Sequence, residues 1–200
     1  MATTLTGLGF VWAFLSLAAA ITCCSGFYLP FWIQGKLMGK VDAYFSSFRR
    51  CNYPRVTSQG AVEIVMECGR YSRFWDIPSP WWQASTVMVG TGSALSLLVA
   101  VTAVSACCIT YVVHTSSARI AGALQLFAAL LVSGGVALYP IGWDNREVRD
   151  CCGNTSHVYR LGTCQISWSV YLLSVAVLML LLCFCLSFCA SQVKPGCFRT

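Results

Sequence analysis

The sequence is poor in charged residues, and long stretches of it have none. Only 10% of its 200 residues are charged, whereas about a quarter of the residues of a soluble domain are. Asp, Glu, Lys and Arg are absent from four segments: 1–35, 77–118, 120–143 and 161–193. Each segment contains the ~20 mostly apolar residues that a helix needs to cross a bilayer. This pattern excludes a soluble globular domain and predicts four spanning helices.

The charge-free segments divide the chain into spans and loops. The predicted spans are residues 8–29, 82–113, 120–139 and 165–188, all in a single membrane domain of residues 1–200. Two long loops and a tail lie between and after the spans, at residues 30–81, 140–164 and 189–200. The second and third spans are joined by so short a turn that they must form an antiparallel hairpin.

The first apolar run also has the features of a signal-peptide core, with small residues at Ala18–Ala20 near a cleavage position. A signal peptide begins with basic residues, and residues 1–9 contain none. The apolar run also continues to Leu29. We therefore expect a retained helix.

Three helix starts have sequence signals. Ser79 followed by Pro80 predicts an N-cap and a first helical residue for the second span. Ser117 is the predicted cap of the third span. Asp144 with Glu147 predicts a capping box for one short helix in the second long loop.

The first long loop predicts a small sheet. In residues 61–68 every second residue is apolar, which is typical of a half-buried strand. Residues 31–38 and 42–51 are weaker strand candidates, rich in aromatic residues. So small a sheet is marginal alone. A disulfide between Cys51 and Cys68 would stabilise it by about 3 kcal/mol.

Two signals place both long loops outside the cell or in a lumen. Disulfides persist only in oxidising compartments. The second long loop holds clustered cysteines beside Asn154, which begins an Asn-Thr-Ser glycosylation acceptor. The positive-inside rule disagrees, because ten of the thirteen basic residues lie in these loops. We give the two luminal signals more weight and expect a multi-pass plasma-membrane protein with both termini in the cytoplasm.

Six motifs, in order along the chain, carry a family resemblance. They are "FRRCNYP" (48–54), "ECGRY" (67–71), "IPSPWW" (77–82), "ALYPIGWD" (137–144), "CGNTS" (152–156) and "LGTCQISW" (161–168). Together they resemble the lipoma HMGIC fusion partner-like family of tetraspan proteins, which are cousins of the claudins. Claudins carry Gly-Leu-Trp where this chain has "SSF" at 46–48, so claudin barrier function does not transfer whole.

The resemblance implies a claudin-like fold, in which a left-handed four-helix bundle carries an extracellular sheet of first-loop strands with a final strand from the second loop. It also implies disulfides Cys51–Cys68 and Cys152–Cys164. Cys151 is then an extra thiol that would swap partners, stay reduced or link to another chain. Known members act as auxiliary or assembly subunits of membrane complexes, including ion channels and neurotransmitter receptors.

Catalytic and transport chemistry has little support in the sequence. Transporters place ionisable groups within their spans, and here Gln125 is the most polar side chain inside a predicted span. We expect Gln125 to bond to a neighbouring helix. His114 and His157 are the two histidines and fall on opposite sides of the membrane. We therefore expect no enzyme activity, no cofactor, no metal site and no nucleic-acid binding.

Two sets of residues are candidates for modification or binding. Cysteines near the cytoplasmic face are candidates for S-palmitoylation, with unmodified thiols as the alternative: Cys107, Cys108, Cys185, Cys189 and Cys197. The first long loop has seven basic residues, five of them arginines, against four acidic ones, which favours an acidic partner surface: Arg49, Arg50, Arg55, Arg70 and Arg73. The alternative is that these arginines pair with acidic residues of their own loop, namely Glu63, Glu67 and Asp76.

The prediction is therefore a non-enzymatic subunit that binds a channel, receptor or adhesion protein through its helices and extracellular sheet. The alternative is a claudin-like adhesion or paracellular barrier component, which would assemble with copies of itself. A small transporter or membrane enzyme is the third class, and the charge-free spans argue against it.

Overall fold

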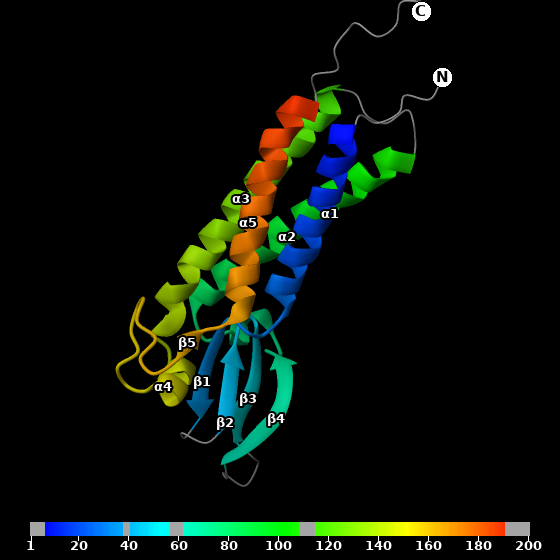
Figure 1. The fold of residues 1–200 in the computed structure, drawn as a ribbon. Helices are drawn as coiled ribbons and strands as arrows, with labels where there is room; N and C mark the ends of the chain where they lie inside the picture. The colour runs from blue at the N-terminus through cyan, green and yellow to red at the C-terminus, as the bar shows by residue number, and fades with distance from the viewer. Residues whose placement is uncertain (1–6, 38–40, 57–61, 109–114, 191–200) are drawn as a thin grey trace, which may run out of the picture.

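A computed structural model describes residues 7–37, 41–56, 62–108 and 115–190. Four long helices form a bundle, with a small sheet at one end (Figure 1). The long helices are α1 (Gly7–Tyr28), α2 (Pro80–Cys108), α3 (Thr115–Leu138) and α5 (Trp168–Ala190). All four are long and apolar enough to cross a membrane, as the charge-free segments predicted. Helices α1 and α3 begin, and α2 and α5 end, away from the sheet.

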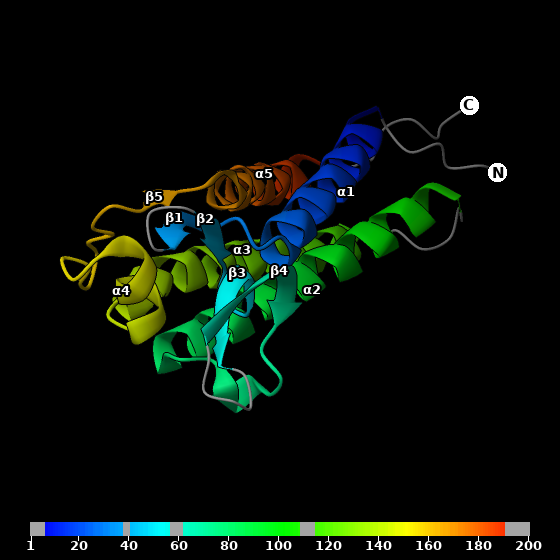
Figure 2. The ribbon, with the colours of Figure 1, turned by 90° about the horizontal axis from the view of Figure 1, so that it is seen from below.

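The bundle has a simple neighbour order. Helix α1 packs against α2 and α5, and α3 packs against the same two helices. Figure 2 shows α1 and α5 on one side and α2 and α3 on the other, so α1 and α3 lie on a diagonal. Small residues permit close packing where apolar burial gives no drive in lipid. A Cβ on Gly92 of α2, for example, would lie 2.7 Å from Val132 Cγ2 of α3.

The sheet has five antiparallel strands in the order β4-β3-β2-β1-β5. Their bounds are β1 Ile33–Leu37, β2 Val41–Phe45, β3 Arg49–Val56, β4 Val62–Arg70 and β5 Gln165–Ile166. Strand β5 pairs with β1 although it lies more than 120 residues later in the chain, after the second long loop, as the family resemblance implied. It occupies residues that we assigned to the fourth span, and α5 begins only at Trp168.

Two strand predictions differ from the structure. The candidate at 42–51 is two strands, because the chain turns at Ser46, whose N–H donates to Arg49 O (2.8 Å) and whose hydroxyl accepts from Arg49 N (3.1 Å). Strand β4 is an edge strand, and its apolar face is buried only in part: Ile64 packs against the core, whereas Met66 is 66% exposed.

Of the three helix starts predicted from the sequence, one agrees with the structure. Helix α2 begins at Pro80, and Ser79 O accepts from Trp82 N (3.0 Å). Helix α3 begins at Thr115, before the predicted cap at Ser117. The capping box at Asp144 was also wrong. Helix α4 (Arg146–Cys152) is capped one residue later, by Asn145, whose side-chain oxygen accepts from Val148 N (3.0 Å).

Aromatic residues join the sheet to the bundle. Trp32, just before β1, and Trp82 of α2 are both fully buried. The Trp82 ring stacks on Tyr139 with centroids 5.1 Å apart, and Trp32 meets the edge of Tyr139 at 4.8 Å. The Trp82 indole N–H donates to Tyr139 O (3.2 Å), and the Trp32 indole N–H donates to Gly26 O (2.9 Å). This joint holds the sheet in a fixed position on the helices.

Candidate functional site

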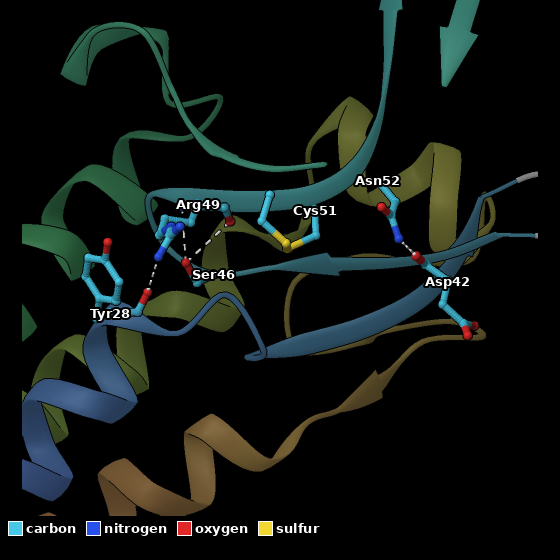
Figure 3. The surroundings of a disulfide bond; sticks show 7 residues. Tyr28, Asp42, Ser46, Arg49, Cys51 and Asn52 are labelled. Carbon is cyan, nitrogen blue, oxygen red and sulfur yellow. Dashed lines mark hydrogen bonds between the residues drawn. A yellow bond between two sulfur atoms is a disulfide. The ribbon is translucent and has the colours of Figure 1, made fainter. Parts of the chain in front are cut away.

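The candidate site is the polar region at the sheet end, here called the sheet-end module: the described residues of 30–79 and of 139–167. Two disulfides cross-link it. Cys51 and Cys68 lie directly opposite each other on β3 and β4, with Cα atoms 4.0 Å apart (Figure 3). Cys152 at the end of α4 is linked to Cys164, just before β5.

A glycine on β1 permits the second disulfide to approach. A Cβ on Gly35 would overlap the sulfur of Cys164 and would lie 3.5 Å from Cys151 Cβ. Helix α4 packs against β1 in the same place (Figures 1 and 2). No local pattern in the sequence predicts this contact, because residues of the two long loops meet there.

An asparagine shapes the neighbouring strand. Asn52 has φ 55° at a bulge between Cys51 and Tyr53. Asparagine adopts this left-handed conformation more readily than most residues. Its side-chain Nδ2 donates to Asp42 O (2.6 Å), which ties the bulge to β2 (Figure 3).

Arg50 links the sheet to α4. Its guanidinium pairs with Glu147 and lies over the rings of Tyr53 and Tyr71, 4.1 and 4.8 Å from their centroids. The second Glu147 oxygen accepts from Tyr71 Oη (2.6 Å). Burial and the adjacent Glu147 carboxylate raise the pKa of Tyr71 above its usual range. The acidic partner of Arg50 is therefore Glu147 in the other loop, and not an acidic residue of its own loop.

Arg49 binds the end of a helix. Its Nη1 donates to Tyr28 O (3.1 Å) at the end of α1, and its guanidinium lies 4.4 Å from the centre of the Tyr28 ring (Figure 3). A cation at a helix C-terminus is favourable because the helix dipole is negative there. Arg49, like Arg50, therefore makes contacts that hold the fold together.

The structure describes the side chains of two of the three other arginines predicted for a partner surface. Arg70 and Arg73 have exposed side chains, and the Arg55 side chain lies outside the described part of the structure. Of the described arginines, Arg49 and Arg50 thus already have partners within the protein, and Arg70 and Arg73 have exposed side chains.

Cys151 is a buried free thiol. It is 5% exposed. Burial, with smaller contributions from the Asp150 and Glu147 carboxylates, raises its pKa to about 12. The thiol is therefore protonated and unreactive at neutral pH.

The remaining predicted modification sites fall partly outside the described residues. Asn154 lies in an exposed turn after α4. Cys185 is exposed on α5, at the end of the bundle away from the sheet. Nothing is described for Cys197 or for the side chains of Cys107, Cys108 and Cys189.

The structure also has a groove that sequence analysis missed. It lies between β1 and α4, with a volume of about 550 Å³. Its lining includes Gln34, Gly35, Lys36, Asp42, Asp150 and Thr163. Strand β5 pairs only with Ile33 and Gln34, so within the described residues no strand lies beside Gly35–Leu37 on the groove side.

Across the described chain, no cluster of His, Cys, Asp and Glu suited to a metal is present.

Inside the bundle, Gln125 bonds to another helix, but that helix is α1 and not, as we expected, a direct neighbour of α3. It is 1% exposed. Its Oε1 accepts from Trp12 Nε1 (3.3 Å), and its Nε2 donates to Ser16 Oγ (2.8 Å). Both partners lie on α1, diagonally across the bundle, so Gln125 joins two helices that are not direct neighbours.

Comparison with known proteins identifies the family. A family model described as "Lipoma HMGIC fusion partner-like protein" matches residues 8–192. The chain belongs to this family. It is 29% identical to LHFPL tetraspan subfamily member 2a of Danio rerio over 185 residues, 86% of this chain and 82% of the relative. It is 27% identical to member 4 of Mus musculus over 183 residues, 90% of this chain and 70% of the relative.

Membership of the lipoma HMGIC fusion partner-like family agrees with the resemblance noted in the six motifs. Together with the four apolar helices, it makes the chain an integral multi-pass membrane protein of tetraspan type. The family model covers both cross-linked loops as well as the spans.

Proposed function

We propose that this protein is a non-enzymatic auxiliary or assembly subunit of a larger membrane complex. Its helices and sheet-end module would bind a channel, receptor or adhesion protein. Apart from Arg119 near the start of α3, the described residues of the four long helices contain no Asp, Glu, Lys, Arg or His. Within the described residues, the charged side chains are thus concentrated in the sheet-end module.

The cross-linking of the sheet-end module is the observation that carries the proposal. Two disulfides and the Arg50–Glu147 pair join its parts to one another, and the aromatic joint around Tyr139 attaches it to the bundle. A surface fixed before binding loses less entropy when it binds.

The fixed module has two places suited to a partner's backbone. Strand β4 is at the open edge of the sheet, and the groove lies beside the uncovered part of β1. An open strand can add an extended segment of another chain by main-chain hydrogen bonds.

In the proposed orientation the sheet-end module faces the outside of the cell and the opposite end faces the cytoplasm, with the protein in the plasma membrane. Disulfides at the sheet end and an exposed Asn154 sequon support this orientation. The positive-inside rule opposes it, but Arg49 and Arg50 have structural tasks that explain why they lie at this end.

The test is purification of the tagged chain from its native membrane under mild conditions, with the mass and composition of the complex measured. We expect a complex with a second membrane protein in fixed stoichiometry. Recovery of the chain alone, or only of polymers that form at cell contacts, would contradict the proposal. The second result would support a claudin-like barrier component instead.

A further inference from the structure

An exposed aromatic pair lies just before α2. Phe74 and Trp75 belong to a short 3-10 turn, Phe74–Asp76, and their rings meet edge to face with centroids 5.4 Å apart. Trp75 is 78% exposed, the highest value among the described large apolar side chains, and Phe74 is 40% exposed. Leaving two such rings in water is unfavourable, so we expect either lipid or protein to cover them.

The backbone of this turn is held firmly while the rings point outward. Asp76 Oδ2 accepts from Arg73 N (3.0 Å), and Ile77 N donates to Phe74 O (3.4 Å). The next residue toward α2, Ile77, is only 5% exposed and belongs to the main core. The rings are therefore displayed on a fixed support.

The turn lies close to the level at which the helices leave the bilayer. Asp76 is four residues before Pro80, where α2 begins, so at most about 14 Å of extended chain separates them. Strand β4 runs toward the bundle and brings the chain to the junction of sheet and helices (Figure 1).

Other exposed aromatic residues mark the same level, on three of the long helices and against the end of the fourth. Tyr28 is the last residue of α1, Trp81 is the second of α2, and Trp168 is the first of α5; they are 63%, 44% and 48% exposed. Tyr159 (59% exposed) donates to Ala137 O in the last turn of α3 (2.8 Å). Trp and Tyr are enriched where helices meet the membrane–water interface.

We propose that Phe74 and Trp75 insert into the headgroup region of the lipid leaflet on the sheet side. The occupant of this surface is therefore phospholipid. The exposed Arg73 beside the pair is placed to meet lipid phosphate. This contact would anchor the sheet-end module to the bilayer at a site remote from the groove, and it does not depend on the proposed subunit function.

The test uses the full-length chain in nanodiscs of phosphatidylcholine, with or without phosphatidylcholine that carries a nitroxide on its headgroup. The chain has seven tryptophans, so the emission of Trp75 is taken as the difference between the wild type and Trp75→Phe. Trp81→Phe gives the same difference for a tryptophan at the start of α2 and is the matched control.

We expect the nitroxide lipid to quench most of the Trp75 emission, as it does for Trp81, and aqueous iodide to quench little of it. Strong quenching by iodide without quenching by the nitroxide lipid would place Trp75 in water and overturn the proposal. Protection from both quenchers would also overturn it, because the rings would then be covered by protein. If the protection were lost in nanodiscs that hold one copy each, the covering protein would be a second copy.

Discussion

At the scale of single residues, contacts between the two long loops decide how the sheet-end module is built. Arg50 comes from β3, and its acidic partner Glu147 comes from α4, 97 positions later. The sequence predicted an acidic partner only within the first loop, because a partner distant in the sequence leaves no local signal.

Replacing Glu147 with Gln should destabilise the protein. The side chains of Arg50 and Glu147 are 25% and 27% exposed, so losing the charge leaves a partly buried guanidinium with a weaker partner, at a cost of roughly 1–3 kcal/mol. Thermal unfolding in a fixed detergent measures the effect. The control is Asp150→Asn, because its partner Arg146 is 94% exposed and such a pair contributes about 0–1 kcal/mol. Equal losses in the two variants would contradict the account.

Replacing Gly35 with Ala should disrupt the second disulfide or the packing of α4 on β1. The new Cβ would overlap Cys164 Sγ, and overpacking of this kind costs about 1–3 kcal/mol. Gly69→Ala is the matched control in the same sheet, because the nearest atom to its Cβ would be Tyr53 Oη at 3.6 Å. Unfolding temperatures and non-reducing peptide maps compare the two, and an unchanged Gly35→Ala protein would refute the assignment.

Cys151 should resist alkylation in the folded protein. Its pKa is raised to about 12 by burial, so the thiolate is scarce at pH 8, whereas the unfolded thiol with a pKa of about 8.5 reacts. Because the folded state holds this proton more tightly, its contribution to stability is complete below about pH 8.5 and is lost as pH rises toward 12. Iodoacetamide labelling followed by peptide mass spectrometry, before and after denaturation, measures this. Rapid labelling of the folded protein, or a disulfide to another chain, would contradict the structure.

At the scale of elements, the sequence predicted those that have local signals. Charge-free segments located the four long helices, and Ser79-Pro80 located the start of α2. The cap of α4 was misplaced by one residue because Asp144 and Asn145 are both good capping residues. Strands β2 and β3 were joined because the turn at Ser46 contains no Gly or Pro. The exposure of β4 depends on its place at the edge, which is a property of the whole sheet.

The link between α3 and α1 should contribute to the stability of the bundle. Gln125→Leu would leave Trp12 Nε1 and Ser16 Oγ without their bonds to the glutamine. Polar contacts between membrane helices are worth about 0.6 kcal/mol on average and up to about 1.7. Ser174→Ala is the control, since that hydroxyl bonds only within its own helix, to Val170 O (3.0 Å). Resistance to unfolding in a detergent titration should fall for Gln125→Leu and stay constant for Ser174→Ala; the reverse order would refute the link.

At the scale of the whole molecule, the fold was predictable, whereas the shape and charge of the sheet-end surface were not. Hydropathy and the six motifs predicted a tetraspan protein with a small sheet. The groove is formed only when β1, α4 and the segment before β5 come together. The five arginines looked like one surface in the sequence, but Arg49 and Arg50 turn toward α1 and α4. Charge counts along a loop cannot show which charges are already paired.

The central claim is that the sheet-end module binds a partner protein, and site-specific photo-crosslinking in native membranes tests it most directly. A photoreactive residue is placed at Lys36 in the groove, at Met66 on the open edge of β4, and at Arg146 as an exposed control on α4 outside the groove. We predict that Lys36, Met66 or both crosslink to the same membrane protein that co-purifies with the chain, and that Arg146 does not. Absence of a heterologous crosslink from both Lys36 and Met66 would contradict the account.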